Sequence, residues 1–499
     1  MAANTRNALF VALATFALAL AIRLLGVGLR EPWLDEVYSQ FAISREWYGL
    51  AADRISRGHS PLYYALMKAF GIPGADVAAM RAASSVFDAL GAGIVAGALA
   101  LHVGRPAALF FGFLYAWSPV AIHWAQNARP YGLLIFFVSI GLAGAIGLLA
   151  TLGREGAVAT RRQRRLFGFG FSMASLTITA GIFAFLATAL LPFALPRTRR
   201  DKAFLKRWKK ALKVPAVVSV LAYFAMSGPH IARQVDGYWA EKYNPLGLDG
   251  LGRLWSSMLS DGGLAEGIAR LGGPQAANMP LIWAGSALFV AFLVLGLARI
   301  RYRPALIAPA CLMAGYTLIL LCVSIWTSVL VARYFLPPWI ALLALAGTGM
   351  AAARARTRWS WLAIAPLMLL FAFSGYFKAT QPGAPRDRSL EPVAEIINRV
   401  PPETVSLLID KTGGVRSELI LELWPHHFDR PELDRMWPRS FTLSRLTDAL
   451  ESGQNSFAYF QQDGLDEALQ EGAPEPRCLY RFDDWVLAYW GEANEVCAP

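Results

Sequence analysis

The feature that most constrains this chain is a succession of apolar windows of about 20 residues, each long enough to cross the hydrocarbon core of a bilayer. Apolar residues make up 56% of the 499 residues and charged residues only 16%, which excludes an ordinary soluble protein. The pattern predicts a multi-spanning α-helical membrane protein with about eleven spans, at 8–29, 83–102, 106–125, 130–151, 166–180, 182–196, 212–228, 279–298, 304–323, 335–353 and 359–377.

Two of these windows, 166–180 and 182–196, are short for separate crossings. They fit a tight hairpin, a re-entrant pair or one long tilted helix, so the sequence leaves the helix count open there. The first window is too long for a cleaved signal peptide and lacks a clear small-residue cleavage site. We therefore expect it to remain as a membrane span.

Charge predicts the orientation of the spans. The loop at 197–213 carries nine basic residues against one acid, and three further loops are basic, namely 154–165, 299–303 and 354–358. By the positive-inside rule these loops are cytoplasmic, which leaves the nearly charge-balanced loops 30–82 and 229–278 on the outer side. The net charge of +12 is therefore a topology signal, and its spread over separate short loops does not indicate nucleic-acid binding.

The chain changes character after residue 377. Residues 378–499 carry 12 basic and 21 acidic residues, a net charge of −9, and their apolar runs shorten to strand length. Three strands are expected at 404–410, 457–461 and 485–490, with helical patterns at 391–400 and 416–423. We expect a membrane domain over 1–377 and a soluble α/β domain over 378–499, which eleven spans and a cytoplasmic start place outside.

The four cysteines fall into two pairs. Cys311 and Cys322 lie in an apolar span and are expected to pack there. Cys478 and Cys497 lie in the outer domain, where an oxidising compartment would allow them to form a disulfide. The sequence contains no distance that decides between the free and bonded forms.

Asp35 and Glu36 stand just after the first span, in the loop that ends in His59-Ser-Pro-Leu-Tyr-Tyr64. Two adjacent carboxylates at a membrane edge beside aromatic residues suggest chemistry on a substrate that arrives through the lipid. The plain alternative is a pair of interfacial charges.

Few other charges lie within or at the edges of the spans, where each is costly. On the expected topology five of them approach the outer face: Arg23, Arg81, Asp88, Arg129 and Arg333. Snorkelling explains single arginines, but it explains their convergence less well. Arginine binds phosphate bidentately, so the cluster indicates a cavity for a lipid phosphate. Asp88 is expected to pair with Arg23 or Arg81 and to hold it in place.

Four motifs occur in a fixed order: Asp35-Glu36, the His59 box, Arg129-Pro-Tyr131 and Arg333-Tyr-Phe-Leu-Pro337. In this order and topology they resemble the integral-membrane glycosyltransferases of the GT-C fold, in the branch of the protein O-mannosyltransferases and lipid A aminoarabinose transferases. The resemblance covers most of residues 8–377. Relatives often have His-Pro-Pro where this chain has His59-Ser60-Pro61.

The resemblance implies a donor with one sugar on a polyprenyl phosphate. It also implies transfer to a hydroxyl of a glycolipid, glycan or protein, usually with inversion, at the periplasmic face of a bacterial inner membrane. Asp35 matches the first acid of the family's pair and is the candidate general base. Glu36 points elsewhere and is expected to hold the loop, orient a partner or help bind the acceptor.

Arg129 and Arg333 are the candidate ligands of the donor phosphate, together with Arg81. The sugar or acceptor pocket is expected to include His59, Tyr63, Tyr131 and Tyr334, for which packed or interfacial roles are the alternative. No cofactor is expected: a divalent metal is possible, but the six histidines show no ligand spacing.

Three other classes of function fit parts of the pattern. A flippase or transporter of lipid-linked sugars predicts charges at mid-membrane and internal repeats, which this chain lacks. A polymerase or ligase typically places its key residues in large later loops, whereas the acid pair here lies in the first. A binding module on a membrane anchor would not need so many spans.

Overall fold

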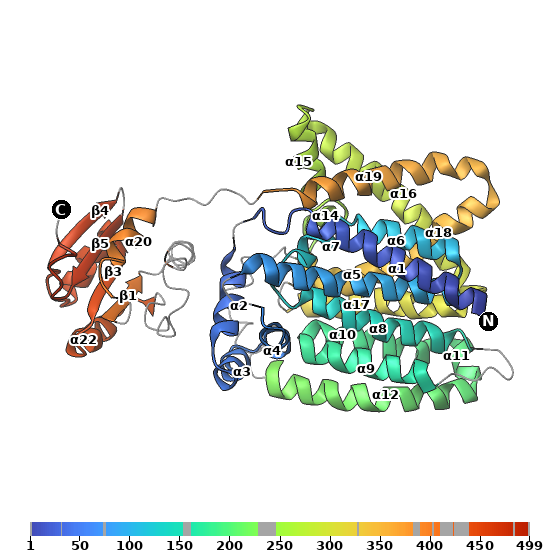
Figure 1. Ribbon diagram of the computed structural model, residues 1–499, viewed down its shortest axis with the longest axis horizontal. Helices are drawn as coiled ribbons and strands as arrows, with labels where there is room; N and C mark the ends of the chain where they lie inside the picture. The colour runs from blue at the N-terminus through green and yellow to red at the C-terminus, as the bar shows by residue number, and fades with distance from the viewer. Residues whose placement is uncertain are drawn as a thin grey trace. The chain divides into compact units, whose positions relative to one another are not determined.

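The computed structural model of the chain divides into two compact units (Figure 1). The first comprises Met1–Arg30 and Trp47–Pro382, and the second comprises Glu31–Glu46 and Gly383–Pro499. The segment after the first span, which the sequence assigned to the membrane domain, thus belongs to the C-terminal unit. The structure describes residues 2–30, 32–72, 76–152, 161–227, 246–326, 329–382, 390–401, 404–409, 423, 439–482 and 485–497.

The first unit is built from helices. Its longer helices are α1 (Ala2–Leu24), α5 (Val77–His102), α6 (Arg105–Ala116), α8 (Tyr131–Leu149), α9 (Arg161–Thr177), α10 (Thr179–Leu190), α12 (Lys202–Ala222), α16 (Asn278–Ala298), α17 (Ile307–Ser324), α18 (Leu336–Arg356) and α19 (Trp361–Ala379). Shorter elements connect them: α3 (Trp47–Ser56), α4 (Leu62–Ala69), α7 (Pro119–Ala125), α11 (Pro196–Arg200), α14 (Leu248–Leu259), α15 (Gly263–Arg270) and η6 (Ala332–Phe335).

Seven helices of the described residues are long and apolar enough to cross a bilayer, or eight if the bent pair α6–α7 is one span. The sequence predicted eleven windows. Three of these windows overlap α9, α10 and α12, which do not meet the criterion for a span. Helices α9 and α10 are short, and α12 begins with a basic run. The chain is thus a multi-pass helical protein, and its helices α9, α10 and α12 are not single apolar helices of full membrane-spanning length.

The predicted span 106–125 is two helices, α6 and α7, which meet at an angle of 61°. Pro119 is the first residue of α7, and a proline ring there would clash with the carbonyl four residues earlier if α6 continued. Ser118 at the break accepts a hydrogen bond of 2.8 Å from the Trp339 indole. The break gives α7 its own direction, and α7 carries residues of the candidate site.

Helices α8 and α18 form the centre of the first unit, since 89% of each hydrophobic window is buried, against 33% for α1 and 28% for α19. Small residues allow the backbones to approach closely. A Cβ atom at Gly170 of α9 would collide with the backbone of Gly141 in α8, and one at Gly296 of α16 would collide with Leu345 in α18. Close contact through glycine is typical of helices that associate in a membrane.

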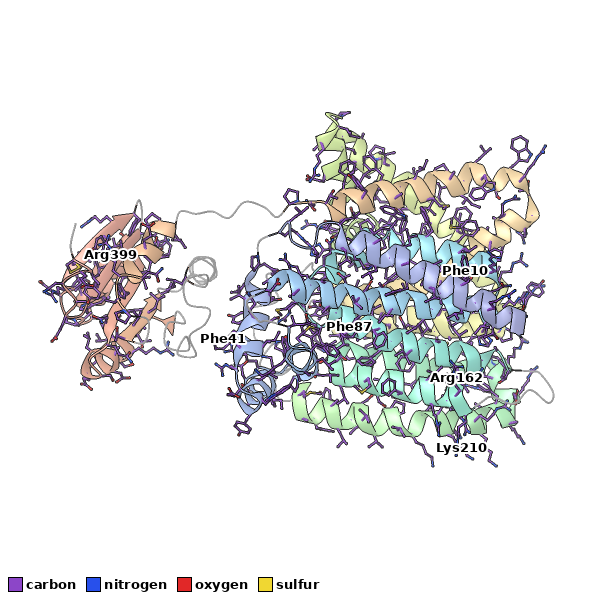
Figure 2. The ribbon with its side chains drawn as sticks, in the orientation of Figure 1. Phe10, Phe41, Phe87, Arg162, Lys210 and Arg399 are labelled. Atoms are coloured by element: carbon purple, nitrogen blue, oxygen red, sulfur yellow. A yellow bond between two sulfur atoms is a disulfide. The ribbon has the colours of Figure 1, made fainter. Side chains whose placement is uncertain are left out.

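Basic side chains gather at one end of the first unit. Figure 2 shows Arg162 of α9 and Lys210 of α12 toward the same end. Arg197 of α11 donates a hydrogen bond of 3.0 Å to the carbonyl of Arg301, so the basic segments 197–213 and 299–303 meet in space. This proximity agrees with the prediction that the basic loops share one side of the membrane.

A buried ion pair joins the first three spans. Arg23 Nε lies 2.5 Å from Asp88 Oδ1, and the two side chains are 0% and 4% exposed. The Tyr115 hydroxyl donates to Asp88 Oδ2 at 2.7 Å, and Arg23 Nη1 donates to the carbonyls of Ala19 and Ala116. The predicted structural role of Asp88, as the partner of Arg23, is confirmed.

The second unit contains a five-stranded sheet in the order β2-β1-β3-β5-β4. Strands β1 (Val405–Ile409), β3 (Asn455–Gln461) and β5 (Trp485–Trp490) match the three predicted strands, and β2 (Arg439–Ser440) and β4 (Cys478–Phe482) complete the sheet. β1 is parallel to β2 and β3, whereas β5 is antiparallel to β3 and β4. The predicted helix at 391–400 is α20 (Glu391–Ile397), and the one at 416–423 lies outside the described residues except Leu423.

Alternate residues of β3 serve two separate apolar cores. Phe457 and Tyr459 belong to one core with α20, and Ala458 and Phe460 belong to the other with α22 (Leu443–Glu451) and α23 (Gln462–Gln470). The first core also contains Val37 and Phe41 of α2 (Leu34–Ser44), with Leu34 packed against it. This helical spacing explains why α2 belongs to the C-terminal unit.

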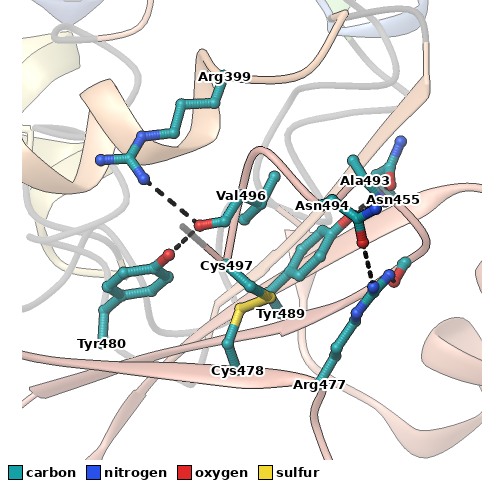
Figure 3. Close-up of a disulfide and its surroundings, with 11 residues drawn as sticks. Arg399, Asn455, Arg477, Cys478, Tyr480, Tyr489, Ala493, Asn494, Val496 and Cys497 are labelled. Carbon is teal, nitrogen blue, oxygen red and sulfur yellow. Dashed lines mark hydrogen bonds between the residues drawn. A yellow bond between two sulfur atoms is a disulfide. The ribbon is translucent and has the colours of Figure 1, made fainter. Parts of the chain in front are cut away.

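A disulfide joins Cys478 at the start of β4 to Cys497, with 5.8 Å between the two Cα atoms (Figure 3). The residue before Cys497 is also held: the carbonyl of Val496 accepts hydrogen bonds from Arg399 Nη1 and from the Tyr480 hydroxyl. The disulfide thus ties the C-terminal segment to the edge strand of the sheet.

We expect Cys497→Ser to destabilise the second unit by about 3 kcal/mol, because the bond closes a loop with a sequence separation of 19. Hydrogen exchange of full-length protein in detergent should speed up in peptides covering β4 and residues 491–497. Cys322→Ser, at an exposed free cysteine, is the matched control. Unchanged exchange in Cys497→Ser would contradict the assigned role.

Removing Asp88 alone should cost about 3–5 kcal/mol, since Arg23 is left charged and buried without its acid. Thermal unfolding in detergent should show a clearly lower midpoint for Asp88→Leu. The double variant Arg23→Met with Asp88→Leu should recover most of the loss, because it removes both charges. Glu266→Gln, which breaks a half-exposed pair with Arg270, is the control and should change stability by less than about 1 kcal/mol.

Candidate functional site

The acid pair occupies the first turn of α2. Glu36 is fully buried, and its Oε2 accepts a hydrogen bond of 3.4 Å from the backbone N–H of Trp33. This contact closes the start of the helix in the way a capping carboxylate does. Asp35 is only partly buried, and Ser39 Oγ donates to its carbonyl at 3.0 Å. Both acids lie in the second unit, whereas the other predicted site residues lie in the first.

Arg129 lies in the turn between α7 and α8 and is 7% exposed. Its Nη1 donates a hydrogen bond of 3.1 Å to the hydroxyl of Tyr64 in α4. The ring of Tyr64 also faces Arg54 of α3, whose guanidinium carbon lies 5.1 Å from the ring centroid. Arg54 is itself 1% exposed and pairs with Asp53 through Nε at 2.7 Å. Two buried guanidinium groups therefore converge on one tyrosine.

A small pocket lies beside this cluster. His59, Ser60, Tyr64 and Pro130 line it, together with Gly58, Ser175, Thr177, Ile178, Thr179 and Met226. The structure thus brings the His59 box and the Arg129 box together around Tyr64. Tyr63 instead points toward α5, where its hydroxyl forms a hydrogen bond of 2.8 Å with Ser84 Oγ. Several hydroxyl groups and one imidazole make the pocket suited to a polar ligand.

Arg333 of η6 lies near the aromatic rings of Trp124 in α7 and of its own neighbour Tyr334. Its guanidinium carbon is 5.9 Å from the Trp124 ring centroid and 5.4 Å from that of Tyr334. The ring of Trp124 in turn packs edge-on against Tyr131, with 4.9 Å between centroids. Trp124 therefore links the two predicted arginine boxes. Guanidinium groups held by aromatic rings in a buried site are well suited to bind an anion.

Three charged or titratable side chains, those of His123, Asp261 and Lys378, form a cluster next to Trp124. Asp261, in the turn between α14 and α15, lies 2.6 Å from His123 Nδ1 and 3.0 Å from Lys378 Nζ, both measured to Oδ2. The His123 ring packs on Trp124 with 4.8 Å between centroids. Burial raises the pKa of Asp261, but His123 and Lys378 outweigh burial and bring that pKa down to about 2.

Arg81 holds the chain where it leaves α1. Its Nη1 donates to the carbonyls of Val27 and Arg30, at 3.2 and 2.6 Å. Gln126, after α7, donates to the carbonyls of Arg23 and Ala379 and accepts from Arg30 Nη2 at 3.2 Å. These bonds satisfy carbonyl groups at the ends of α1 and α19 and in the segment that follows α1, as a membrane protein requires.

Sequence reasoning missed several members of this region. Tyr64 stands beside Tyr63 in the same box, so an equal weight on both tyrosines would have found it. Arg54 and Asp53 lie in α3, outside any motif. His123, Asp261 and Lys378 are far apart in the chain, and no local signal connects them. Among the described residues, no group of three or more His, Cys, Asp or Glu side chains is arranged to hold a metal ion.

No protein-family model matches the chain, and no curated protein sequence matches it significantly. Solved structures do. ArnT from Cupriavidus metallidurans bound to undecaprenyl phosphate is 15% identical with a TM-score of 0.61, and the match covers 98% of this chain and 99% of ArnT. The apo state of that protein is 16% identical, with coverages of 96% and 97% and a TM-score of 0.58.

The archaeal oligosaccharyltransferase AglB from Archaeoglobus fulgidus, in complex with an inhibitory peptide and a dolichol-phosphate, also matches. It is 12% identical with a TM-score of 0.53, and the match covers 90% of this chain and 69% of AglB. ArnT and AglB are both membrane glycosyltransferases of the GT-C fold. The chain therefore has the GT-C fold, as the resemblance of its motifs implied.

The low pKa of Asp261 predicts an acid-dependent loss of stability. The folded-state pKa of about 2 is below the usual 3.8, so the carboxylate stabilises the fold fully above about pH 4 and loses this effect as pH falls toward 2. The stability gap between wild type and Asp261→Asn should therefore shrink by about 2 kcal/mol over this range. Thermal midpoints in detergent between pH 6 and pH 2 measure it.

Glu266→Gln is the control for this titration and should follow the wild-type curve, since its carboxylate is a half-exposed partner of Arg270. A constant gap between wild type and Asp261→Asn at all pH values would show that the charge of Asp261 does not stabilise the fold.

Proposed function

We propose that this protein is a membrane glycosyltransferase that moves a single sugar from a polyprenyl-phosphate donor to an acceptor hydroxyl. The observation that carries the proposal is the likeness of fold, which extends over nearly the whole of this chain and of ArnT. ArnT is bound to undecaprenyl phosphate in that structure, and AglB to a dolichol-phosphate. A lipid phosphate is also a ligand that Arg129, which is buried, and Arg333, which is partly buried, would suit.

Arg129 and Arg333 are our proposed ligands of the donor phosphate. When the bond between the anomeric carbon and the phosphate oxygen breaks, the lipid phosphate leaves with an added negative charge. Fixed guanidinium groups stabilise this charge without reorganising at the moment of reaction. Arg54 packs on the ring of Tyr64, whose hydroxyl accepts from Arg129, and its own charge is balanced by Asp53. We assign Arg81 a supporting role, because its Nη1 donates to the carbonyls of Val27 and Arg30.

Asp35 is our proposed general base. The acceptor oxygen attacks the anomeric carbon as its proton passes to the carboxylate, which yields the glycosidic bond, free polyprenyl phosphate and one proton for the base to release. An attack from the face opposite the phosphate inverts the anomeric centre. Glu36 is buried and bonded to the start of α2, which favours a role in holding Asp35.

The sugar or acceptor is proposed to bind among His59, Tyr131 and Tyr334, with Tyr64 beside His59. The pocket lined by His59 and Tyr64 supports this role, because its hydroxyl groups can exchange hydrogen bonds with a sugar. Tyr63 is proposed to support the pocket without lining it, because its hydroxyl is hydrogen-bonded to Ser84 of α5. The acceptor classes remain a glycolipid, a glycan or a protein.

We propose that the reaction takes place at the periplasmic face of a bacterial inner membrane. The basic loops predict that their own side is cytoplasmic, which leaves the second unit outside. The disulfide between Cys478 and Cys497 supports this orientation, because disulfides persist in oxidising compartments and are rare in the cytosol.

Purified protein in nanodiscs, supplied with a panel of polyprenyl-phosphate sugars and an envelope extract as acceptor, should release free polyprenyl phosphate from one donor. Asp35→Asn should lower the rate by about 10²–10⁴-fold, because the variant cannot accept the proton. Glu46→Gln, an exposed acid at the end of the same segment, should leave the rate unchanged.

The outcomes separate the parts of the proposal. Release that Asp35→Asn does not slow would remove the assignment of the base and leave the transferase class standing. No release from any donor, with wild-type protein that is folded and monodisperse, would overturn the proposed function and favour a flippase or polymerase.

A further inference from the structure

We propose that His123, Asp261 and Lys378 form a positioning triad that holds Trp124, and through it Arg333, in place for the donor phosphate. The inference rests on the proposed function, since it assigns a role at the same anion site. None of the three was a candidate from the sequence, and none is placed in contact with substrate. Their role would be to hold Arg333, which is proposed to contact the donor phosphate, in a fixed position.

Asp261 has an unusual backbone conformation. Its φ of +42° is in the left-handed region, and among the described residues it is the non-glycine residue with a positive φ. Such a conformation persists where surrounding contacts over-determine it, and it is often found at functional sites. Here the contacts are the ion pairs of its carboxylate with His123 and Lys378 and a hydrogen bond of 3.2 Å from Ser257 Oγ to its Oδ1.

The turn that carries Asp261 is seated directly on α19. A Cβ atom at Gly263 would collide with the carbonyl of Ser374, and Lys378 lies one turn further along the same helix. Gly262, the residue before α15, has a φ of +77°, a left-handed conformation that glycine adopts without a steric cost. Asp261 thus fastens the α14–α15 turn to α19 through Lys378 and to α7 through His123.

Two of the elements that Asp261 holds together, α7 and α14, lie against η6, which carries Arg333. Helix α14 packs against both α7 and η6, and η6 also packs against α7. Within this group the rings of His123 and Trp124 are 4.8 Å apart, and the guanidinium carbon of Arg333 is 5.9 Å from the Trp124 ring. A shift of His123 would therefore move the aromatic surface against which Arg333 lies.

The charges of the triad suit a supporting role. Asp261 and Lys378 neutralise each other, so the carboxylate does not repel a phosphate, and the lysine does not compete with the arginines for it. The guanidinium group of Arg333, whose carbon lies 5.9 Å from the centroid of the Trp124 ring, is then the cationic group that we assign to the phosphate. This arrangement separates the residues that hold the site from those that would bind the anion.

A double-mutant cycle on the full-length protein tests the triad. The probe is polyprenyl phosphate without a sugar, and the measured quantity is its Kd in detergent for wild type, Asp261→Asn, Arg333→Ala and the double variant. We expect Asp261→Asn to weaken binding about tenfold, as for residues coupled through a shared contact. In the Arg333→Ala background the same change should have no further effect, because Asp261 acts through Arg333.

A second variant keeps the test independent of folding. Trp124→Leu leaves the triad intact and removes the ring between His123 and Arg333, so it should weaken binding in the same non-additive way. Glu266→Gln on the neighbouring helix α15 is the control and should bind as wild type. Thermal unfolding and gel filtration confirm which variants are folded.

The outcomes distinguish this inference from the proposed function. Wild type that does not bind polyprenyl phosphate overturns the proposed function and the inference with it. Wild-type binding that Arg333→Ala does not weaken, or losses from Asp261→Asn and Trp124→Leu that add fully to that of Arg333→Ala, overturn the inference alone. Non-additive losses in both pairs support it.

Discussion

The cost of keeping a charge away from water governs the arrangement of the first unit. Arg23 is paired with Asp88, Arg54 with Asp53, and Lys378 with Asp261. The first and third pairs join separate segments, whereas Asp53 and Arg54 are neighbours within α3. Within the described part of the first unit, these pairs place buried charges beside opposite charges, and Arg129 and Arg333 add two further guanidinium groups near the candidate site. Guanidinium groups held at fixed positions in this way are suited to bind an anion.

The proposed chemistry is divided between the two units. Arg129 and Arg333 belong to the first unit, in the turn between α7 and α8 and in η6 respectively. Asp35 belongs to α2, whose apolar residues Val37 and Phe41 share a core with the sheet of the second unit. The stability of that core therefore supports the proposed base, although the strands themselves carry no residue of the site. A core substitution in the second unit could lower activity without any change in donor affinity.

The features that could be predicted from the sequence are those that depend on local residue patterns. Strands at 404–410, 457–461 and 485–490 were found because alternation and β-branched or aromatic residues identify them locally. The GT-C resemblance was found because its motifs keep their order. The break at Pro119, the convergence of Arg54 and Arg129 on Tyr64, and the triad at Asp261 could not be predicted. Each depends on contacts between distant segments, and apolar windows are alike whether a helix continues or bends.

The bond between Cys478 and Cys497 has a consequence for how the protein matures. The helices can insert as they leave the ribosome, but the last residues can be locked only after they have been translated and oxidised. Formation of this bond is therefore a thiol-oxidation step that can occur only after Cys497 has been translated. In a host that lacks thiol-oxidising enzymes, the reduced tail would be a substrate for quality-control proteases, and the yield of intact protein would fall for a reason unrelated to its membrane helices.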